Sequence, residues 1–189
     1  MATTQYGFWV EPDRCIKCWS CQVACKAWKG IKAGTISNRK VLDIWDGTFP
    51  TVTRTFVSLS CMHCEKPACM GVCPVSAISK RPDGIVVVDQ AKCIGCKACS
   101  LACPFGVPQY IESGKMAKCD FCIDRLEAGK EPACVANCPT QALHSGSLED
   151  LAKLAANKGG TRLPGTTQPA VLISKYSGDT KILTLAGPK

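Results

Sequence analysis

Apolar and polar positions along the chain predict several short strands. Residues 6–10 form a short aromatic and aliphatic run, and residues 51–59 alternate β-branched with polar side chains, so we predict a strand at each. Residues 85–89 form a third predicted strand, because they follow the turn-forming run at residues 82–84. No apolar run approaches the ~18 residues that a transmembrane helix needs. We therefore expect a chain that is soluble or reaches a membrane only through a partner.

The C-terminal region predicts one helix followed by an extended tail. Ser147 opens a capping-box signature, so the helix should run to about Asn157 and end at Gly159-Gly160. The last 30 residues are rich in Gly, Pro and Thr and contain short apolar runs at 170–173 and 182–185. We expect a strand or hairpin in this tail, lying on a partner subunit that would also bury the aromatic N-terminal strand.

Cysteine usage adds the first chemical information. The chain has 16 cysteines among 189 residues, far above ordinary usage. The segment from Cys93 to Pro104 reads Cys-Ile-Gly-Cys-Lys-Ala-Cys-Ser-Leu-Ala-Cys-Pro, which is the run that binds iron–sulfur clusters in bacterial ferredoxins. Its first three thiolates can bind one cuboidal cluster from a single loop. Cys103 lies one helical turn beyond Cys99 and points toward a second cluster.

Four such motifs together contain all of the cysteines. They are Cys15-x-x-Cys18-x-x-Cys21-x-x-x-Cys25, Cys61-x-x-Cys64-x-x-x-x-Cys69-x-x-x-Cys73, Cys93-x-x-Cys96-x-x-Cys99-x-x-x-Cys103, and Cys119-x-x-Cys122 with Cys134-x-x-x-Cys138 after an 11-residue insert. The insert is charged and predicts a helical turn and a solvated loop. The first motif matches the third and the second matches the fourth, so the repeat order is a, b, a′, b′.

The repeat order predicts an α+β fold of two ferredoxin-like units, one inserted in the other, with an extended C-terminal tail. The short spacing between the second and third motifs makes residues 59–104 the inserted unit. Residues 1–58 and 105–146 then form the outer unit, from the first and fourth motifs, and residues 147–189 form the C-terminal helix and tail. A tandem arrangement of the two units is the alternative.

Other uses of cysteine fit the sequence less well. A disulfide framework would need a secretory signal, and the first ten residues have neither a basic nor an apolar region of that kind. Zinc sites use Cys-x-x-Cys pairs without a third cysteine two residues on, so a zinc-structured scaffold is a weaker alternative. An iron–sulfur redox sensor or regulator usually attaches a DNA-binding or signalling module, for which this chain has no room.

The formal charge of +8 does not require a nucleic-acid partner. Bound thiols are deprotonated, so four oxidised four-iron clusters would contribute about −8. The basic residues are then counter-charges to the clusters, and nearby cations raise a cluster's reduction potential. Five lysines lie within or beside the motifs: Lys17, Lys26, Lys92, Lys97 and Lys118.

Few other side chains offer chemistry. His63 could act as a ligand, but the second motif already has four cysteines, so we favour a hydrogen-bonding or packing role. Trp19 and Trp28 either shield a cluster or form a docking surface, and we favour shielding. No Ser/His/Asp constellation, phosphate loop or paired-carboxylate site is present, and His63 and His144 are the only histidines. We expect no catalytic site in this chain.

Longer segments around the motifs add a resemblance. They are Tyr6-Gly-Phe, Ser60-Cys-x-His-Cys-Glu-x-Pro-Ala-Cys, Asp83-Gly-x-Val-Val-Val-Asp, Cys93-Ile-Gly-Cys, Ala102-Cys-Pro-Phe-Gly-x-Pro-Gln-Tyr and Lys118-Cys-Asp-x-Cys. In these segments the chain resembles the iron–sulfur (B) subunit of the dimethyl sulfoxide reductase family, over residues 4 to about 145. Such subunits carry electrons for molybdenum or tungsten bis-pyranopterin oxidoreductases.

The resemblance implies four 4Fe–4S clusters with crossed ligation. Their ligands would be Cys15, Cys18, Cys21 and Cys138; Cys61, Cys64, Cys69 and Cys103; Cys93, Cys96, Cys99 and Cys73; and Cys119, Cys122, Cys134 and Cys25. Nitrate reductase relatives have tryptophan at one third-motif cysteine and hold a three-iron cluster there. The presence of Cys96 implies four irons instead.

The function implied is an electron relay for anaerobic respiration or metabolism. The partners would be a large molybdopterin-type catalytic subunit, nearest the Cys15 cluster, and either a quinone-linked membrane anchor or a soluble electron donor. The Mo/W bis-pyranopterin cofactor would lie in the catalytic subunit. With no signal peptide or transmembrane helix of its own, the chain could be co-exported to the periplasmic side of a membrane-associated complex or work in the cytoplasm.

Overall fold

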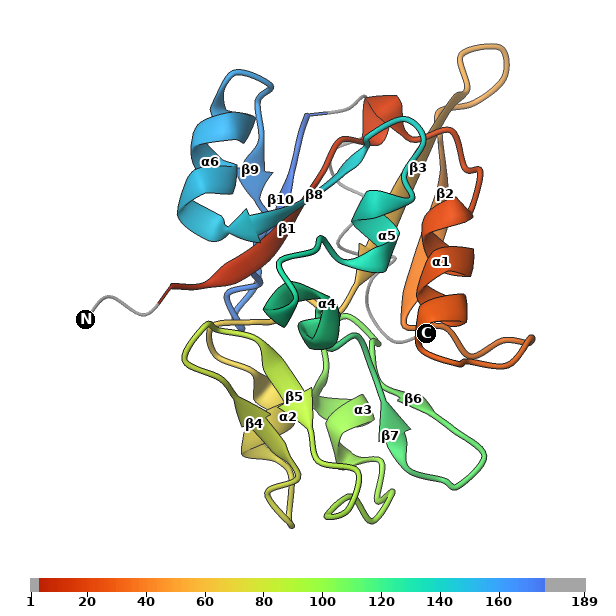
Figure 1. Ribbon diagram of the computed structural model, residues 1–189. Helices are drawn as coiled ribbons and strands as arrows, with labels where there is room; N and C mark the ends of the chain where they lie inside the picture. Colours follow the sequence, from red (N-terminus) through yellow and green to blue (C-terminus); the bar gives the residue numbers. More distant parts are fainter. Residues whose placement is uncertain (1–3, 176–189) are drawn as a thin grey trace.

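A four-stranded sheet joins the two ends of the described chain. The computed structural model describes residues 4–175. The strands of this sheet follow the order β8 (Leu143–Ser147), β1 (Tyr6–Val10), β10 (Val171–Ile173) and β9 (Thr161–Arg162). β1 is antiparallel to β8 and parallel to β10, and β9 is antiparallel to β10. The predicted N-terminal strand is confirmed, and it occupies the middle of the sheet (Figure 1).

Helix α6 (Leu148–Ala156) packs on this sheet and lies where the sequence predicts it. The Ser147 hydroxyl accepts a hydrogen bond from the Asp150 amide at 3.1 Å, which caps the first turn. The apolar face of the helix packs against Trp9 and Leu172 of the two central strands. This small cluster stabilises the sheet from one side.

The end of the described chain corrects one expectation. The run at 170–173 does form a strand, but β10 pairs with β1 of the same chain rather than lying on a partner. Phe8 and Trp9 are already 2% and 3% exposed without a partner subunit. The two strands approach so closely that a Cβ atom at Gly7 would lie 2.3 Å from the carbonyl oxygen of Ala170. The run at 182–185 lies outside the described residues.

The second largest feature is a long hairpin of β2 (Arg39–Asp46) and β3 (Thr53–Ser60). β3 confirms the strand predicted at 51–59. β2 was not predicted, and it pairs along its whole length with β3, from Arg39 opposite Ser60 to Asp46 opposite Thr53. The 3₁₀ turn η1 (Pro12–Arg14) and helix α1 (Ser20–Trp28) lie beside the hairpin (Figure 1).

The elements of the second and third motifs, and those that lead to the fourth, gather at the other end of the molecule (Figure 1). They are α2 (Ala68–Gly71), β4 (Ile78–Lys80), β5 (Val86–Val88), α3 (Ala98–Ala102), β6 (Gln109–Tyr110) and β7 (Met116–Ala117). β5 is the strand predicted at 85–89, whereas its partner β4 was not predicted. Two short helices, α4 (Ile123–Glu127) and α5 (Ala133–Ala136), return the chain toward the sheet. α4 confirms the helical turn expected in the insert.

The largest apolar core lies between these two ends. Buried residues from β1, β3, β10 and the fourth motif meet there, with Phe8 stacked on Phe121 at a centroid distance of 4.3 Å. Cysteines of the second and fourth motifs belong to the same cluster, among them Cys61 and Cys119. Within residues 4–175, none of the helices combines the length and the apolar character needed to span a bilayer.

We predict that Leu172→Ala destabilises the isolated chain, because β10 is part of its own core. Leu172 is 4% exposed, and a buried Leu→Ala change costs about 2–5 kcal/mol. Leu101→Ala is the matched control, since Leu101 is 88% exposed. Anaerobic chemical denaturation of the purified chain measures both. Equal stability of the two variants would contradict the place of β10 in this sheet.

Candidate iron–sulfur centres

None of the sixteen cysteines is in a disulfide, and all lie within the described residues 4–175. A disulfide framework is therefore not what the cysteines build. Twelve of them line three cavities in groups of four, each drawn from two motifs, and the other four are buried and influence one another's pKa. Each quartet is named after the first cysteine of the motif that supplies three of its four members. The Cys15, Cys61, Cys93 and Cys119 quartets have the members of the four expected ligand sets given above.

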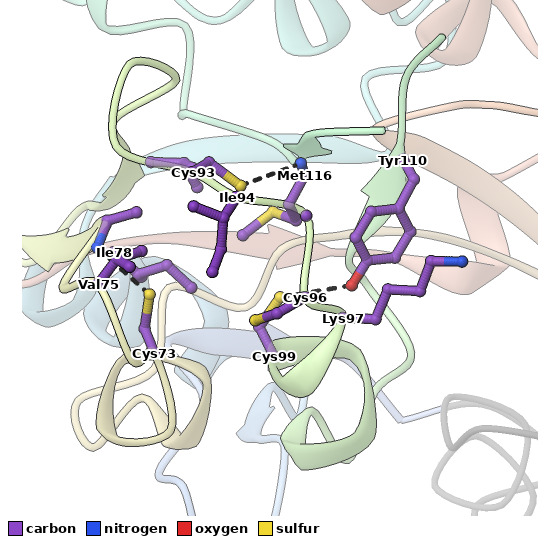
Figure 2. A pocket seen from close by; sticks show the side chains of 13 residues that line it. Cys73, Val75, Ile78, Cys93, Ile94, Cys96, Lys97, Cys99, Tyr110 and Met116 are labelled. Atoms are coloured by element: carbon purple, nitrogen blue, oxygen red, sulfur yellow. Dashed lines mark hydrogen bonds between the residues drawn. The ribbon is translucent and has the colours of Figure 1, made fainter. Parts of the chain in front are cut away.

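The Cys93 quartet surrounds a cavity at the end of the molecule remote from the large sheet. Cys73, Cys93, Cys96 and Cys99 all line it, together with Tyr110 and apolar side chains (Figure 2). The cavity holds about 330 Å³ of empty space, counting the part open to solvent. The amides of Ala77 and Met116 donate hydrogen bonds to the sulfurs of Cys73 and Cys93 at 3.2 and 3.4 Å. Such bonds stabilise a thiolate over a thiol.

The Cys15 quartet surrounds a second cavity, beneath the β2–β3 hairpin. Cys15, Cys18, Cys21 and Cys138 line it, although Cys138 lies more than a hundred residues after the other three. The Ala142 amide donates to Cys138 Sγ at 3.2 Å, and the Ser58 hydroxyl lies 3.2 Å from Cys21 Sγ. Helix α1, which contains Cys21, packs against helix α5, which ends two residues before Cys138.

The Cys61 quartet surrounds a third cavity, which Lys118 also lines. Cys61, Cys64, Cys69 and Cys103 contribute its four sulfurs. Burial raises the pKa of the Cys64 thiol to about 11, and the adjacent Thr167 hydroxyl opposes this shift. Thr167 Oγ1 is buried and has no hydrogen-bond partner within the described part of the chain. A charged sulfur at Cys64 would give this orphaned hydroxyl an acceptor.

The Cys119 quartet is the most deeply buried of the four. Cys25, Cys119, Cys122 and Cys134 are 4–8% exposed. Burial raises the pKa of Cys25 to about 12, and the neighbouring charges of Cys134 and Cys122 act in the same direction. Burial also raises the pKa of Cys119, with Cys134 and Cys25 among its charged neighbours. Cys25 and Cys119 therefore stay protonated at neutral pH unless a bound metal displaces their protons.

Neighbouring quartets lie close enough to influence each other. The pKa of Cys21 is raised by burial and also by the charge of Cys134, which belongs to the Cys119 quartet. The pKa of Cys119 is raised by burial and also by Cys61, which belongs to the Cys61 quartet. The Cys119 quartet is therefore a neighbour of both the Cys15 and the Cys61 quartets. The Cys93 quartet shares the second and third motifs with the Cys61 quartet.

One backbone feature recurs in all four motifs. The residue directly before the second cysteine is left-handed in each: Lys17, His63, Gly95 and Phe121 have φ values of 56°, 40°, 69° and 63°. This conformation bends the loop so that successive thiols turn toward one cavity. It is costly for side chains other than glycine, so the rest of the fold must stabilise it. At Gly95 the chain has no alternative, because a Cβ atom would lie 2.4 Å from the carbonyl oxygen of Gly114.

His63 has the packing role that the sequence favoured. It is fully buried, its Nδ1 accepts a hydrogen bond from the Val86 amide at 3.1 Å, and its ring lies edge-on to Phe121. Burial lowers its pKa well below the usual range, and the charges of Lys118 and Arg39 lower it further. The imidazole is therefore neutral.

The two tryptophans have different roles. Trp19 lines the cavity of the Cys15 quartet while remaining 52% exposed, so it shields that cavity only in part. Trp28 instead ties α1 to α4: its Nε1 donates to Asp124 at 2.6 Å, and Arg125 stacks over its ring. The shielding interpretation fits Trp19 in part, and for Trp28 it stays a prediction.

The five lysines expected as counter-charges have different surroundings. Lys17 pairs with Asp43, and Lys92 lies 3.8 Å from Asp89, so surface carboxylates share their charge. Lys118 is the buried one of the five lysines. Sequence reasoning missed Arg39, a fully buried cation whose place in β2 no motif signalled.

The cavities and donors suit clusters rather than single ions. No group of three or more His, Cys, Asp or Glu side chains in residues 4–175 converges on the position of one metal ion. Four sulfurs around a larger cavity, with amides aimed at the sulfurs, are the donor set of a 4Fe–4S cluster. The residues present therefore fit that group.

Comparisons with known proteins agree with this chemistry. Residues 52–148 match the 4Fe-4S dicluster domain family. The sequence is 42% identical to the B chain of the anaerobic dimethyl sulfoxide reductase of Escherichia coli (strain K12), over 99% of this protein and 98% of that one. The protein belongs to this family of iron–sulfur B subunits. It is also similar to the thiosulfate reductase electron transfer subunit PhsB of Salmonella typhi, at 41% identity over 78% of this protein and 79% of that one.

A further relative is the B subunit of the sulfite dehydrogenase of Allochromatium vinosum, with 39% identity over 78% of this protein and 70% of that one. The relatives are named as B chains, B subunits or electron-transfer subunits. The protein is thus an iron–sulfur electron-transfer subunit of a multisubunit oxidoreductase, and not the catalytic subunit.

We predict that replacing a cysteine of this iron–sulfur protein removes the cluster in the cavity that the cysteine lines, whichever cysteines are its neighbours in sequence. Cys73→Ala and Cys96→Ala should remove the same component of the reduced EPR spectrum, because both sulfurs line one cavity. Cys69→Ala is the matched control: it is four residues from Cys73 but lines another cavity, so it should remove a different component. Loss of one common component in Cys69→Ala and Cys73→Ala would refute the crossed grouping.

Proposed function

We propose that this subunit carries electrons through four 4Fe–4S clusters, one in each quartet. The observation that carries the proposal is the sorting of sixteen cysteines from four motifs into four groups of four, three of which line separate cavities. The first group would be Cys15, Cys18, Cys21 and Cys138, and the other three follow the quartets defined above. Each bound cluster supplies a site that accepts and releases one electron.

The two ferredoxin-like units would be nested. The inserted unit, residues 59–104, holds the second and third motifs, and residues 1–58 with 105–146 form the outer unit. Support comes from the crossing of motifs within quartets: the first pairs with the fourth, and the second with the third. A tandem pair of units would instead group the first motif with the second.

The relay would run from the Cys15 quartet through the Cys119 and Cys61 quartets to the Cys93 quartet. The mutual influence of Cys21 with Cys134, and of Cys119 with Cys61, supports this order. Exposure supports the assignment of its two ends. The two exposed cysteines of the chain are Cys18 and Cys96, one in each terminal quartet. Electrons would enter and leave near these positions.

Each end of the relay has exposed apolar side chains on which a partner could dock. Ile16, Trp19 and Val23 are 61%, 52% and 63% exposed beside the Cys15 quartet. Ile94 and Leu101 are 64% and 88% exposed near the Cys93 quartet. A large molybdopterin-type catalytic subunit would cover the first surface, with a Mo/W bis-pyranopterin cofactor inside that partner. A quinone-linked membrane subunit or a soluble donor would cover the second.

The chain's own residues hold, space and shield the clusters. The left-handed loops aim the thiols, the amides of Ala77, Met116 and Ala142 stabilise the charged sulfurs, and the apolar core around Phe121 excludes water between quartets. The neutral His63 adds no charge to this core. None of these groups needs to gain or lose a proton when an electron passes.

The direct test is the amount of iron and acid-labile sulfide in anaerobically purified protein, with EPR after dithionite reduction. We expect about sixteen irons and sixteen sulfides per chain and magnetically interacting clusters. About eight irons would mean that one pair of quartets holds no cluster, and the proposal would fail in its cluster count. Zinc without sulfide would favour a zinc-structured scaffold.

We also predict that Trp19→Ala weakens the complex with the pterin-bearing subunit about 10- to 30-fold, because a large exposed aromatic beside the terminal quartet is a typical interface anchor. Leu101→Ala, at the opposite end, should leave that affinity unchanged. Both variants should retain full iron content. A titration of each variant against the catalytic subunit would measure the two affinities, and equal weakening by both would contradict the assignment of the two ends.

A further inference from the structure

Arg39 is a buried cation among neutral hydrogen-bond partners. It is 1% exposed at the start of β2, and its guanidinium lies over the Phe8 ring at 4.6 Å. Within the described residues its hydrogen bonds go to the Ser58 carbonyl, the Ser58 hydroxyl and the Ser60 hydroxyl. Its Nε has no partner there. A buried charge is expensive unless an opposite charge compensates for it.

The compensating charges belong to cysteines of two quartets. Burial lowers the pKa of Arg39, but the negative charges of Cys134, Cys119, Cys21 and Cys25 outweigh it and raise the pKa overall. Cys21 belongs to the Cys15 quartet, and the other three belong to the Cys119 quartet. Geometry agrees with this: Arg39 contacts Ser58, which lies beside Cys21 Sγ. It also lies over Phe8, whose ring stacks on Phe121, the residue before Cys122.

The hydrogen bonds around Ser58 have a fixed direction. A guanidinium can only donate, so the Ser58 hydroxyl oxygen accepts from Arg39 Nη1 at 3.2 Å. Its own hydrogen is then free to point at Cys21 Sγ, 3.2 Å away. A metal-bound thiolate can only accept. The series from Arg39 through Ser58 to Cys21 is thus polarised in one direction, which strengthens the bond to sulfur.

We propose that Arg39 and Ser58 are positioning residues that raise the reduction potential of the cluster at the Cys15 quartet, and that Arg39 also raises that of the Cys119 quartet. The inference rests on the proposed function, because it requires clusters at these two quartets. Reduction adds a negative charge to a cluster. A nearby cation and a hydrogen bond donated to its sulfur ligand both stabilise the reduced form.

The two residues should act over different ranges. Ser58 contacts one sulfur, so its effect should be confined to the Cys15 quartet. The charge of Arg39 acts through the low-dielectric interior on both quartets. The pair would thus keep electrons on the two clusters nearest the catalytic subunit.

The experiment is a potentiometric titration of the holoprotein, followed by EPR, on Ser58→Ala, Arg39→Lys and Arg39→Met. In Ser58→Ala we expect a roughly tenfold fall in the reduction equilibrium constant of one cluster, which is ~59 mV for one electron. Arg39→Met should lower the reduction potentials of two clusters, those of the Cys15 and Cys119 quartets. Arg39→Lys keeps the charge but loses the forked donation to Ser58. The potential of the Cys15 cluster should therefore fall, and that of the Cys119 cluster should stay near its wild-type value.

Ser37→Ala is the matched control. Ser37 is a buried serine whose hydroxyl donates to the Arg39 carbonyl oxygen at 2.6 Å. It should leave all four potentials unchanged. Iron and sulfide content is measured on every variant. This inference alone would be overturned if Ser58→Ala and Arg39→Lys held full clusters with wild-type potentials. It would also be overturned if Ser37→Ala shifted a potential as far as Ser58→Ala does. Wild-type protein without clusters would instead overturn the proposed function.

Discussion

The structure depends on the burial of many cysteine sulfurs, the ligands of iron–sulfur chemistry, in the interior of a small protein. A buried thiol prefers to stay neutral, as the raised pKa values of Cys25 and Cys69, each about 12, show. Iron removes the protons but leaves negative charge that the protein must stabilise. Backbone amides and one buried hydroxyl donate to sulfur for this reason, and Arg39 lies where four of the charges meet. Cysteine sulfurs occupy much of the interior that apolar side chains would fill in another protein of this length.

The left-handed residue before each second cysteine shows how one geometry is built from four different sequences. Glycine adopts this conformation at little cost, yet only the third motif has it there. His63 and Phe121 are held in the same conformation by burial against each other and against Phe8. Two motifs therefore stabilise each other's strained loops through one aromatic contact. The same aromatic packing therefore stabilises the strained loops and forms part of the core between the motifs.

The sequence predicts well what depends on local spacing. The strands around residues 6–10, 51–59 and 85–89, the helix after Ser147 and the packing role of His63 all follow from short-range pattern. β2 escapes prediction because its run begins with Arg39 and contains Asp43, which look exposed. Arg39 is buried only because distant cysteines supply its counter-charge, and no local signal contains that information. The place of β10 is hidden for the same reason, since a parallel pairing with β1 joins the two ends of the chain.

The net charge of +8 does not show which cations act on the sulfurs, because the effect of each cation depends on where it lies. Lys17 and Lys32 each pair with carboxylates at or near the surface, where solvent screens them and weakens their influence on distant sulfur. Arg39 and Lys118 are buried, and a single charge in that environment acts more strongly than several at the surface. Two interior cations would therefore act more strongly on the potentials of the proposed relay, while the remaining positive charge can serve solubility and partner recognition. The exposed cysteines lie only in the two terminal quartets, so solvent would add to the effect of Arg39 and Ser58 at one end of the proposed relay, whereas fixed protein charges would dominate in its middle.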